Sequence, residues 1–147
     1  MIAGRPKPAL PREDILHNLT IGAKRERTIL VTTETCISFM GESGPRVLST
    51  PNMIGLMELT SRDLAFPMLE PGYDTVGTKV NVSHLAAAGI GDVVTFTAWL
   101  IAATERRIEF RVEAKRGNET IGEGTHERAI INVEKFAART APKRGSA

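Results

Sequence analysis

The most constraining feature of this 147-residue chain is a long apolar segment that begins at Thr50-Pro51 and ends before Pro67. Thr followed by Pro is typical of a helix start, with Thr50 as the N-cap and Pro51 at the first helical position. The apolar residues recur at helical spacing around most of the circumference: Met53, Ile54, Leu56, Met57, Leu59, Leu64 and Ala65. A helix that is apolar on most sides is a buried one, so the rest of the chain has to enclose it.

Strand-like segments lie on both sides of this helix in the sequence. A β-branched run precedes it at residues 28–37,. Four alternating or β-prone runs follow it, at residues 75–88, 92–103, 107–115 and 120–133. The links between these four, at residues 88–91, 104–106 and 116–119, are short enough for antiparallel hairpins. Five strands and one buried helix predict an α+β hot-dog fold, in which an antiparallel five-stranded sheet wraps around the central helix.

Composition indicates one domain with irregular ends. A hydrophobic fraction of 41% and a charged fraction of 24% are ordinary for a globular protein,. We expect an N-terminal arm over residues 1–20, because prolines are frequent there, a hot-dog domain over residues 21–136, and a flexible basic tail over residues 137–147,. A domain of this size buries limited surface by itself, so we expect a homodimer.

The same sequence argues against several classes of function. A net charge of +2, with one Trp, one Tyr and five Phe residues, does not favour nucleic acid as a partner,. No apolar run reaches the roughly 20 residues of a membrane span, and no signal peptide is recognisable. Cys36 is the only cysteine, so nothing implies secretion, and we expect a cytoplasmic protein without membrane contact,. The dispersed His17, His84 and His126 lack metal-ligand spacing, so we expect neither a metal nor a cofactor.

Glu58 is the most informative polar residue, because it lies in the middle of the helix that should be buried. A buried carboxylate is costly unless it is paired, hydrogen-bonded or protonated, and such carboxylates cluster at functional sites. The alternative is an ion pair with Arg62, one turn along the helix. The sequence pattern leaves both interpretations open.

Two further residues are candidates for chemistry. His84 ends an alternating face that contains Val76, Thr78, Val80 and Val82, so we expect its side chain to point toward the helix,. The alternative for His84 is a core histidine that bonds a backbone carbonyl, and the alternative for Thr50 is a capping role alone. Capping and catalysis are compatible for Thr50, since the field at a helix N-terminus is positive.

Several segments resemble the fluoroacetyl-CoA thioesterase family over residues 50–136. They are residues 50–58 (TPNMIGLME), 69–72 (LEPG), Gly77-Thr78 with Val82-Ser83-His84, and 121–136, which contains GTHERAI. The resemblance implies a homodimeric hot-dog enzyme that hydrolyses acyl-CoA thioesters. It assigns catalysis to Thr50, Glu58 and His84, and contact with the acyl end of the substrate to Gly77 and Arg128.

The resemblance does not extend to the family's lid, which carries Phe residues over the acyl pocket. Residues 41–48 contain no Phe, so the resemblance favours hydrolysis of a short acyl-CoA without favouring fluoroacetyl selectivity. Two alternatives remain at this point. One is a non-catalytic hot-dog module that binds an acyl-CoA or another small ligand. The other is a hot-dog dehydratase, which also uses a histidine and a carboxylate.

Overall fold

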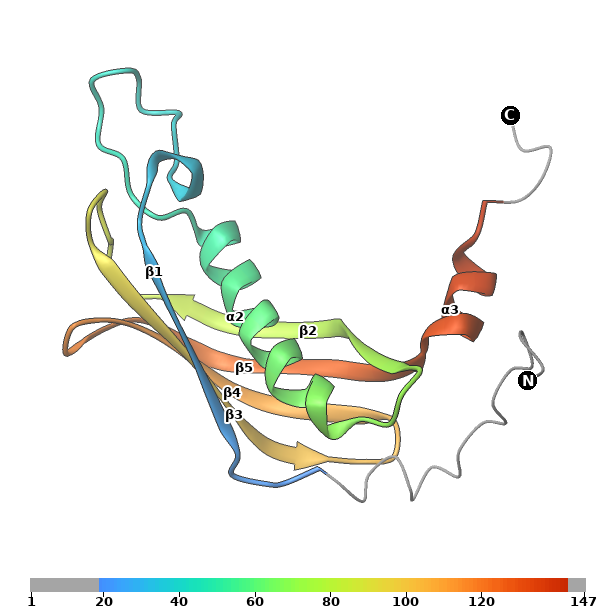
Figure 1. Ribbon diagram of the computed structural model, residues 1–147. Helices are drawn as coiled ribbons and strands as arrows, with labels where there is room; N and C mark the ends of the chain where they lie inside the picture. The colour runs from blue at the N-terminus through green and yellow to red at the C-terminus, as the bar shows by residue number, and fades with distance from the viewer. Residues whose placement is uncertain (1–18, 143–147) are drawn as a thin grey trace.

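The computed structural model describes residues 19–142 and shows a curved antiparallel sheet around one long helix (Figure 1). The helix is α2 (Thr50–Ala65), which lies on the concave face of the sheet. The strands are β1 (Lys24–Leu30), β2 (Tyr73–His84), β3 (Val93–Ala103), β4 (Arg107–Arg116) and β5 (Glu119–Asn132). The smaller elements are η1 (Thr33–Thr35), η2 (Phe66–Met68) and α3 (Val133–Thr140). The hot-dog prediction is therefore confirmed.

The strand order in the sheet is β1-β3-β4-β5-β2, and every neighbouring pair is antiparallel. Residues 104–106 and 117–118 form the two predicted hairpin loops. The third predicted hairpin, at residues 88–91, is wrong, because β2 pairs with β5 instead of β3. Strand β5 has a free edge after pairing with β4, and β2 fills it along its whole length, so residues 85–92 cross to the other side of the sheet.

The first strand lies earlier in the chain than predicted. It occupies Lys24–Leu30 and pairs with β3, after which the chain leaves the sheet and turns through η1. The prediction followed β-branched residues, whereas this edge strand is largely charged and exposed. Edge strands commonly carry charged side chains, so hydrophobic patterning alone misplaces such a strand.

Helix α2 packs against the sheet through Met53, Met57, Leu64 and Ala65, as its apolar circumference predicts. Opposite them lie the fully buried strand residues Val94, Phe96, Ala98, Leu100, Ile108, Phe110, Val112, Ala114 and Ile121. Burial of one large apolar side chain contributes about 1.5–3 kcal/mol. A Cβ atom at Gly122 would lie 2.5 Å from Met53 Sδ, so glycine lets α2 approach β5 closely.

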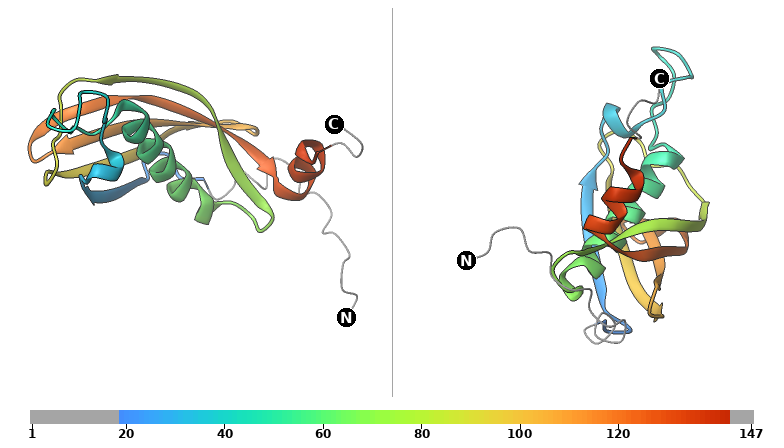
Figure 2. Two further views of the ribbon diagram at one scale, coloured as in Figure 1. Left: turned by 90° about the horizontal axis from the view of Figure 1, so that it is seen from above. Right: turned by 90° about the vertical axis from the view of Figure 1, so that its right-hand side faces the viewer.

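The C-terminal helix α3 projects from the end of β5 and buries no residue (Figures 1 and 2). Residues 137–140, which belong to the predicted tail, are helical here. Residues 1–18 of the predicted arm and 143–147 of the predicted tail lie outside the described residues, so the domain boundaries stay predictions. Within residues 19–142, no helix is long and apolar enough to cross a membrane.

Candidate active site

Thr50 and His84 come together where α2 begins and β2 ends, with Thr50 Oγ1 2.8 Å from His84 Nδ1. The prediction that Thr50 caps the helix is wrong. Ser49 is the N-cap, and its hydroxyl accepts a hydrogen bond from the Asn52 backbone N–H. Because Ser49 satisfies the helix end, the Thr50 hydroxyl is available to His84. Within residues 19–142, the buried His84 Nε2 has no hydrogen-bond partner, so the hydrogen-bonding capacity of this nitrogen is unused there.

A β-bulge decides which β2 side chains face the helix. The pairing of β2 with β5 shifts between Gly77 and Lys79, and such an irregularity reverses the alternation of side chains. Gly77 and His84 are separated by an odd number of positions, yet both face α2. The prediction for His84 is therefore correct, whereas the one for Thr78 is wrong, because Thr78 is exposed and bonds the backbone carbonyl of Glu127.

Glu58 faces a small group of polar residues on β2 and β5. A Cβ atom at Gly77 would lie 2.7 Å from Glu58 Oε1, 3.2 Å from His126 Cε1 and 3.6 Å from Arg128 Nη1. Gly77 pairs directly with Arg128 across the two strands. The absence of a side chain at Gly77 therefore leaves room for the Glu58 carboxylate beside the His126 imidazole and the Arg128 guanidinium. We call this meeting point of the three groups the Gly77 opening.

The alternative pairing of Glu58 with Arg62 is wrong. Arg62 Nη2 binds Asp74 Oδ2 at 2.6 Å, and its Nη1 binds Asp63 Oδ1 at 3.2 Å. Among the described residues, Glu58 forms neither a hydrogen bond nor an ion pair, although its charge acts on His126 and Arg128. The carboxylate is thus not neutralised by its own helix and remains available at the Gly77 opening.

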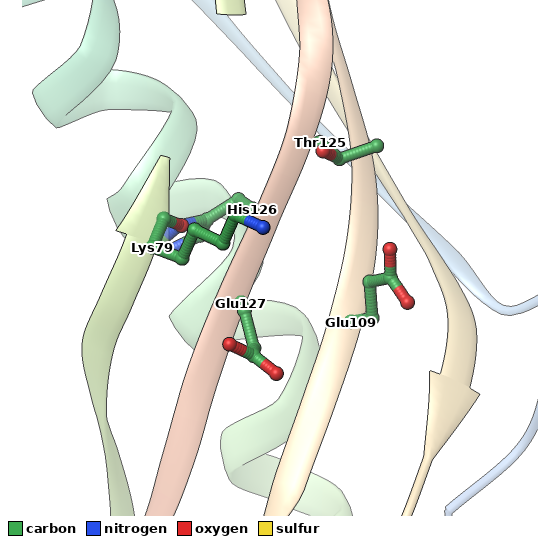
Figure 3. Close-up of a pocket in the computed structure, with 5 residues that line it drawn as sticks. All are labelled: Lys79, Glu109, Thr125, His126 and Glu127. Carbon is green, nitrogen blue, oxygen red and sulfur yellow. The ribbon is translucent and has the colours of Figure 1, made fainter. Parts of the chain in front are cut away.

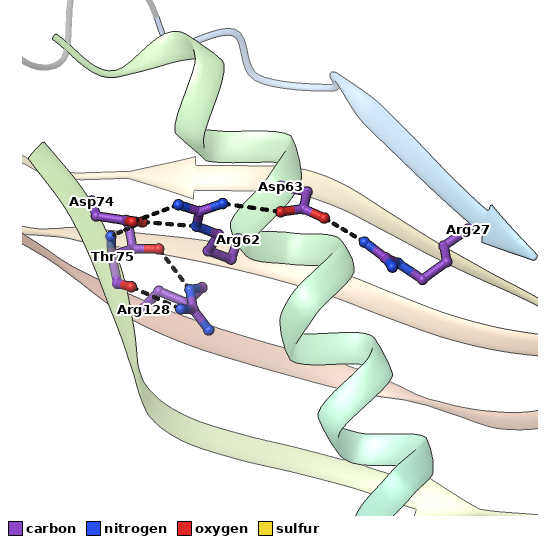
Figure 4. A network of polar contacts seen from close by, with 6 residues as sticks. All are labelled: Arg27, Arg62, Asp63, Asp74, Thr75 and Arg128. Carbon is purple, nitrogen blue, oxygen red and sulfur yellow. Dashed lines mark hydrogen bonds and ion pairs between the residues drawn. The ribbon is translucent and has the colours of Figure 1, made fainter. Parts of the chain in front are cut away.

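Arg128 is only 8% exposed and is held by its neighbours. Its Nε donates to Thr75 Oγ1 at 2.7 Å, and its Nη2 donates to the Thr75 carbonyl at 2.8 Å (Figure 4). Its Nη1 lies 3.2 Å from His126 Nε2. Burial lowers the pKa of the Arg128 guanidinium, and the Glu58 carboxylate opposes this effect. An arginine nonetheless stays protonated, so the Gly77 opening contains a fixed positive charge.

The sequence pattern presents His126 only as a candidate metal ligand, whereas the structure places it in this group. The side chain is 2% exposed, and Nδ1 lies 2.8 Å from the Lys79 carbonyl oxygen. Burial lowers the pKa of His126. The ring is therefore neutral, with Nδ1–H donating to Lys79 and Nε2 accepting from Arg128. The signal that could have found His126 is its spacing, because residues two apart in a strand share one face.

A chain of charged residues runs from the sheet edge to Thr75 (Figure 4). Arg27 on β1 pairs with Asp63, which pairs with Arg62 on α2. Asp74 accepts from Arg62 and, at 2.7 Å, from the Thr75 backbone N–H. Hydrogen bonding with Arg62 lowers the pKa of the Asp74 carboxyl group. Alternating charges thus tie β1, α2 and β2 together behind the Arg128 side chain.

An open cleft of about 430 Å³ adjoins Thr50 and His84. Its apolar lining includes Ile37, Phe39 and Leu85. Phe39 is 79% exposed, and it lies two positions before residues 41–48, the segment that contains no Phe. A second cleft of about 190 Å³ lies on the outer face of the sheet, where Lys79, Glu109, Thr125, His126 and Glu127 surround it (Figure 3).

Within this chain, the predicted site residues form two groups instead of one. Thr50 and His84 make the first group, and Glu58, Gly77 and Arg128 make the second. Along α2 the rise from Thr50 to Glu58 is about 12 Å at about 1.5 Å per residue. Along β2 the distance from Gly77 to His84 is about 20 Å at about 3.3 Å per residue.

Comparison with known proteins finds one family over most of the chain. A family model described as fluoroacetyl-CoA-specific thioesterase matches residues 31–134. The fluoroacetyl-CoA thioesterase of Streptantibioticus cattleyicolor is 46% identical over 99 residues, which are 67% of this chain and 71% of that protein.

Solved structures agree with this match. A structure of the fluoroacetyl-CoA thioesterase FlK is 35% identical with a TM-score of 0.76, covering 84% of this chain and 98% of that one. A thioesterase superfamily member from Thermus thermophilus is 30% identical with the same TM-score, covering 84% and 91%. A hot-dog-like protein from Thermanaerovibrio acidaminovorans shares the fold at 21% identity, with a TM-score of 0.80 over 91% of this chain and 99% of that one.

Proposed function

Because this chain belongs to the fluoroacetyl-CoA thioesterase family and is a thioester hydrolase, we propose that it hydrolyses a short-chain acyl-CoA to the free acid and CoA with Thr50, Glu58 and His84. The observation that carries this proposal is the hydrogen bond between Thr50 Oγ1 and His84 Nδ1 beside the apolar cleft. A hydroxyl that is hydrogen-bonded to one ring nitrogen fixes the orientation of an imidazole that transfers a proton. This pair favours an enzyme over a non-catalytic binding module, and the family match favours hydrolysis over dehydration.

In this proposal the enzyme is a homodimer. It acts in the cytoplasm, and acyl-CoA is its substrate. Among the described residues, β2 has no strand on its outer edge, and Val80 on it is exposed. Symmetric antiparallel pairing of two β2 strands near Val80 would bring His84 of one protomer close to Gly77 of the partner subunit. Dimerisation would thus join the two groups that lie about 20 Å apart along β2 in one protomer.

The proposed reaction forms a C–O bond to water and breaks the thioester C–S bond. Glu58 accepts a proton from the attacking water, and the partner subunit's His84, oriented by the partner's Thr50, donates a proton to the departing CoA sulfur. The positive end of α2 stabilises the negative charge that develops on the carbonyl oxygen. Loss of one such stabilising donor typically reduces the reaction rate about 10²–10³-fold.

We assign the acyl end of the substrate to the opening at Gly77, between Glu58 and Arg128. The cleft beside Phe39 would hold the adjoining part of the substrate, because its volume of about 430 Å³ is typical of small-molecule sites. Phe39 is exposed at the rim of this cleft. In this proposal the groups around Gly77, more than the open cleft, determine which acyl group is accepted.

The test is CoA thiol release from acetyl-CoA, fluoroacetyl-CoA and longer acyl-CoAs, with wild type beside Glu58→Gln. We expect turnover by wild type and a loss of about 10²-fold or more in the variant. Glu123→Gln is the matched control, because Glu123 is an exposed carboxylate on β5. Equal turnover by Glu58→Gln and wild type would remove Glu58 from the mechanism. Binding of acyl-CoA by wild type without thiol release would support the non-catalytic module.

A further inference from the structure

The Arg128 side chain is fixed more completely than a surface substrate contact requires. Its three nitrogen atoms donate three hydrogen bonds, two to Thr75 and one to His126. Thr75 is 5% exposed and His126 is 2% exposed, so neither side chain is free to turn away. Each terminal nitrogen of the guanidinium carries a second N–H. Nη1 lies 3.6 Å from the Cβ position of Gly77, so its second N–H is close to the Gly77 opening.

The two residues that hold Arg128 are themselves held. The Thr75 backbone N–H donates to Asp74 Oδ1 at 2.7 Å, and Asp74 is paired with Arg62 of α2. The Nδ1–H group of His126 donates to the carbonyl of Lys79, directly after the β-bulge. The guanidinium is thereby fixed relative to α2 on one side and to the bulged part of β2 on the other.

His126 has to be neutral for this arrangement. With Nδ1–H donating to Lys79, Nε2 keeps the lone pair that faces the Arg128 N–H. A protonated ring would direct a second N–H at the guanidinium and repel it. Both burial and the charge of Arg128 favour the neutral ring.

We propose that Thr75 and His126 are positioning residues that orient Arg128 toward the acyl group at the Gly77 opening. This inference rests on the proposed contact of Arg128 with the acyl end of the substrate. Thr75 and His126 do not touch the reacting atoms. They act through Arg128, since a guanidinium recognises a partner only when its fork of donors has a fixed direction.

The first test is a double-mutant cycle on kcat/KM for acetyl-CoA. Thr75→Val removes the hydroxyl acceptor with little change in shape, and we expect a loss of about tenfold. Thr75→Ser restores the hydroxyl and should stay within about twofold of wild type. In an Arg128→Gln background, Thr75→Val should add no further loss, because the group on which it acts is gone.

A matched pair at His126 tests the second contact. The amide of His126→Gln can place an acceptor where Nε2 lies, whereas His126→Asn is too short to reach Arg128. We expect His126→Gln to retain more activity than His126→Asn. Equal losses in the two variants, or a Thr75→Val loss that is the same with and without Arg128, would overturn the proposal. Full activity of Arg128→Gln would overturn it as well.

A measurement without substrate separates this inference from the proposed function. In ¹⁵N-labelled protein, the Arg128 Nε–H that donates to Thr75 should give a signal protected from exchange with water. Thr75→Val and Arg128→Lys should both abolish this signal, and Thr75→Ser should keep it. Absence of the signal in wild type refutes the positioning role. Its presence in an enzyme that cleaves no acyl-CoA supports the positioning role and counts against the proposed function alone.

Discussion

Substitution of Gly77 by alanine tests the geometry of the site most directly. The new Cβ atom would lie 2.7 Å from Glu58 Oε1 and 3.2 Å from His126 Cε1. The backbone at Gly77 has no positive φ, so alanine is permitted there and only these contacts oppose it. A nonbonded carbon and oxygen prefer about 3.3 Å or more, so the Glu58 carboxylate has to move by about 0.6 Å.

We expect this movement to reduce turnover much more than stability. Glu58 is at the end of a flexible side chain and can move aside, so the cost of overpacking should be at the low end of about 1–3 kcal/mol. A catalytic group displaced by about 1 Å can lose roughly 10²-fold in rate. For the smaller movement at Gly77 we expect a decrease in kcat of about tenfold to a hundredfold.

The assay combines CoA thiol release with thermal unfolding of Gly77→Ala and a matched control. Gly55→Ala is the control, because no atom lies within 4 Å of its Cβ position in the protomer. A glycine replaced by alanine inside a helix gains about 1 kcal/mol, so this variant should be more stable and equally active. Wild-type turnover by Gly77→Ala would refute the conclusion that Gly77 keeps space for Glu58 and the acyl group.

Three further predictions follow from the site and the sheet edge. Thr50→Val should reduce thiol release at least tenfold while Thr50→Ser retains activity, because only serine keeps a hydroxyl for His84,. Burial lowers the pKa of His126 in the folded protein. Just below pH 6.5 the unfolded chain therefore binds more protons than the folded protein, and the stability of the folded protein falls as the pH decreases through that range. Between pH 7.5 and 5.5, the Tm of His126→Gln should therefore decrease less than the Tm of wild type. Val80→Asp should give monomers by light scattering and lose activity, whereas Val93→Asp, at another exposed position, should leave the dimer intact,.

Local features of the sequence determined the helix and most of the strands. The apolar circumference of residues 50–65 and the flanking Pro51 and Pro67 predict α2, because helix period and proline stereochemistry act over a few residues,. The hairpins at residues 104–106 and 117–118 are equally local,. The position of Glu58 in that helix likewise predicts a functional carboxylate, and this role stays a prediction.

Only the tertiary structure decided how these parts meet. The pairing of β2 with β5 depends on a free strand edge that lies far away in the sequence. The bulge after Gly77 reverses which side chains of β2 face the helix, and no distinctive sequence motif marks this bulge. Ser49, and not Thr50, caps the helix, and the Thr50 hydroxyl is left for a hydrogen bond with His84 on another element. The group of Thr75, His126 and Arg128 likewise exists through pairing across strands. Sequence periodicity specifies which face a residue occupies, but the partner on that face is determined by contacts between distant segments.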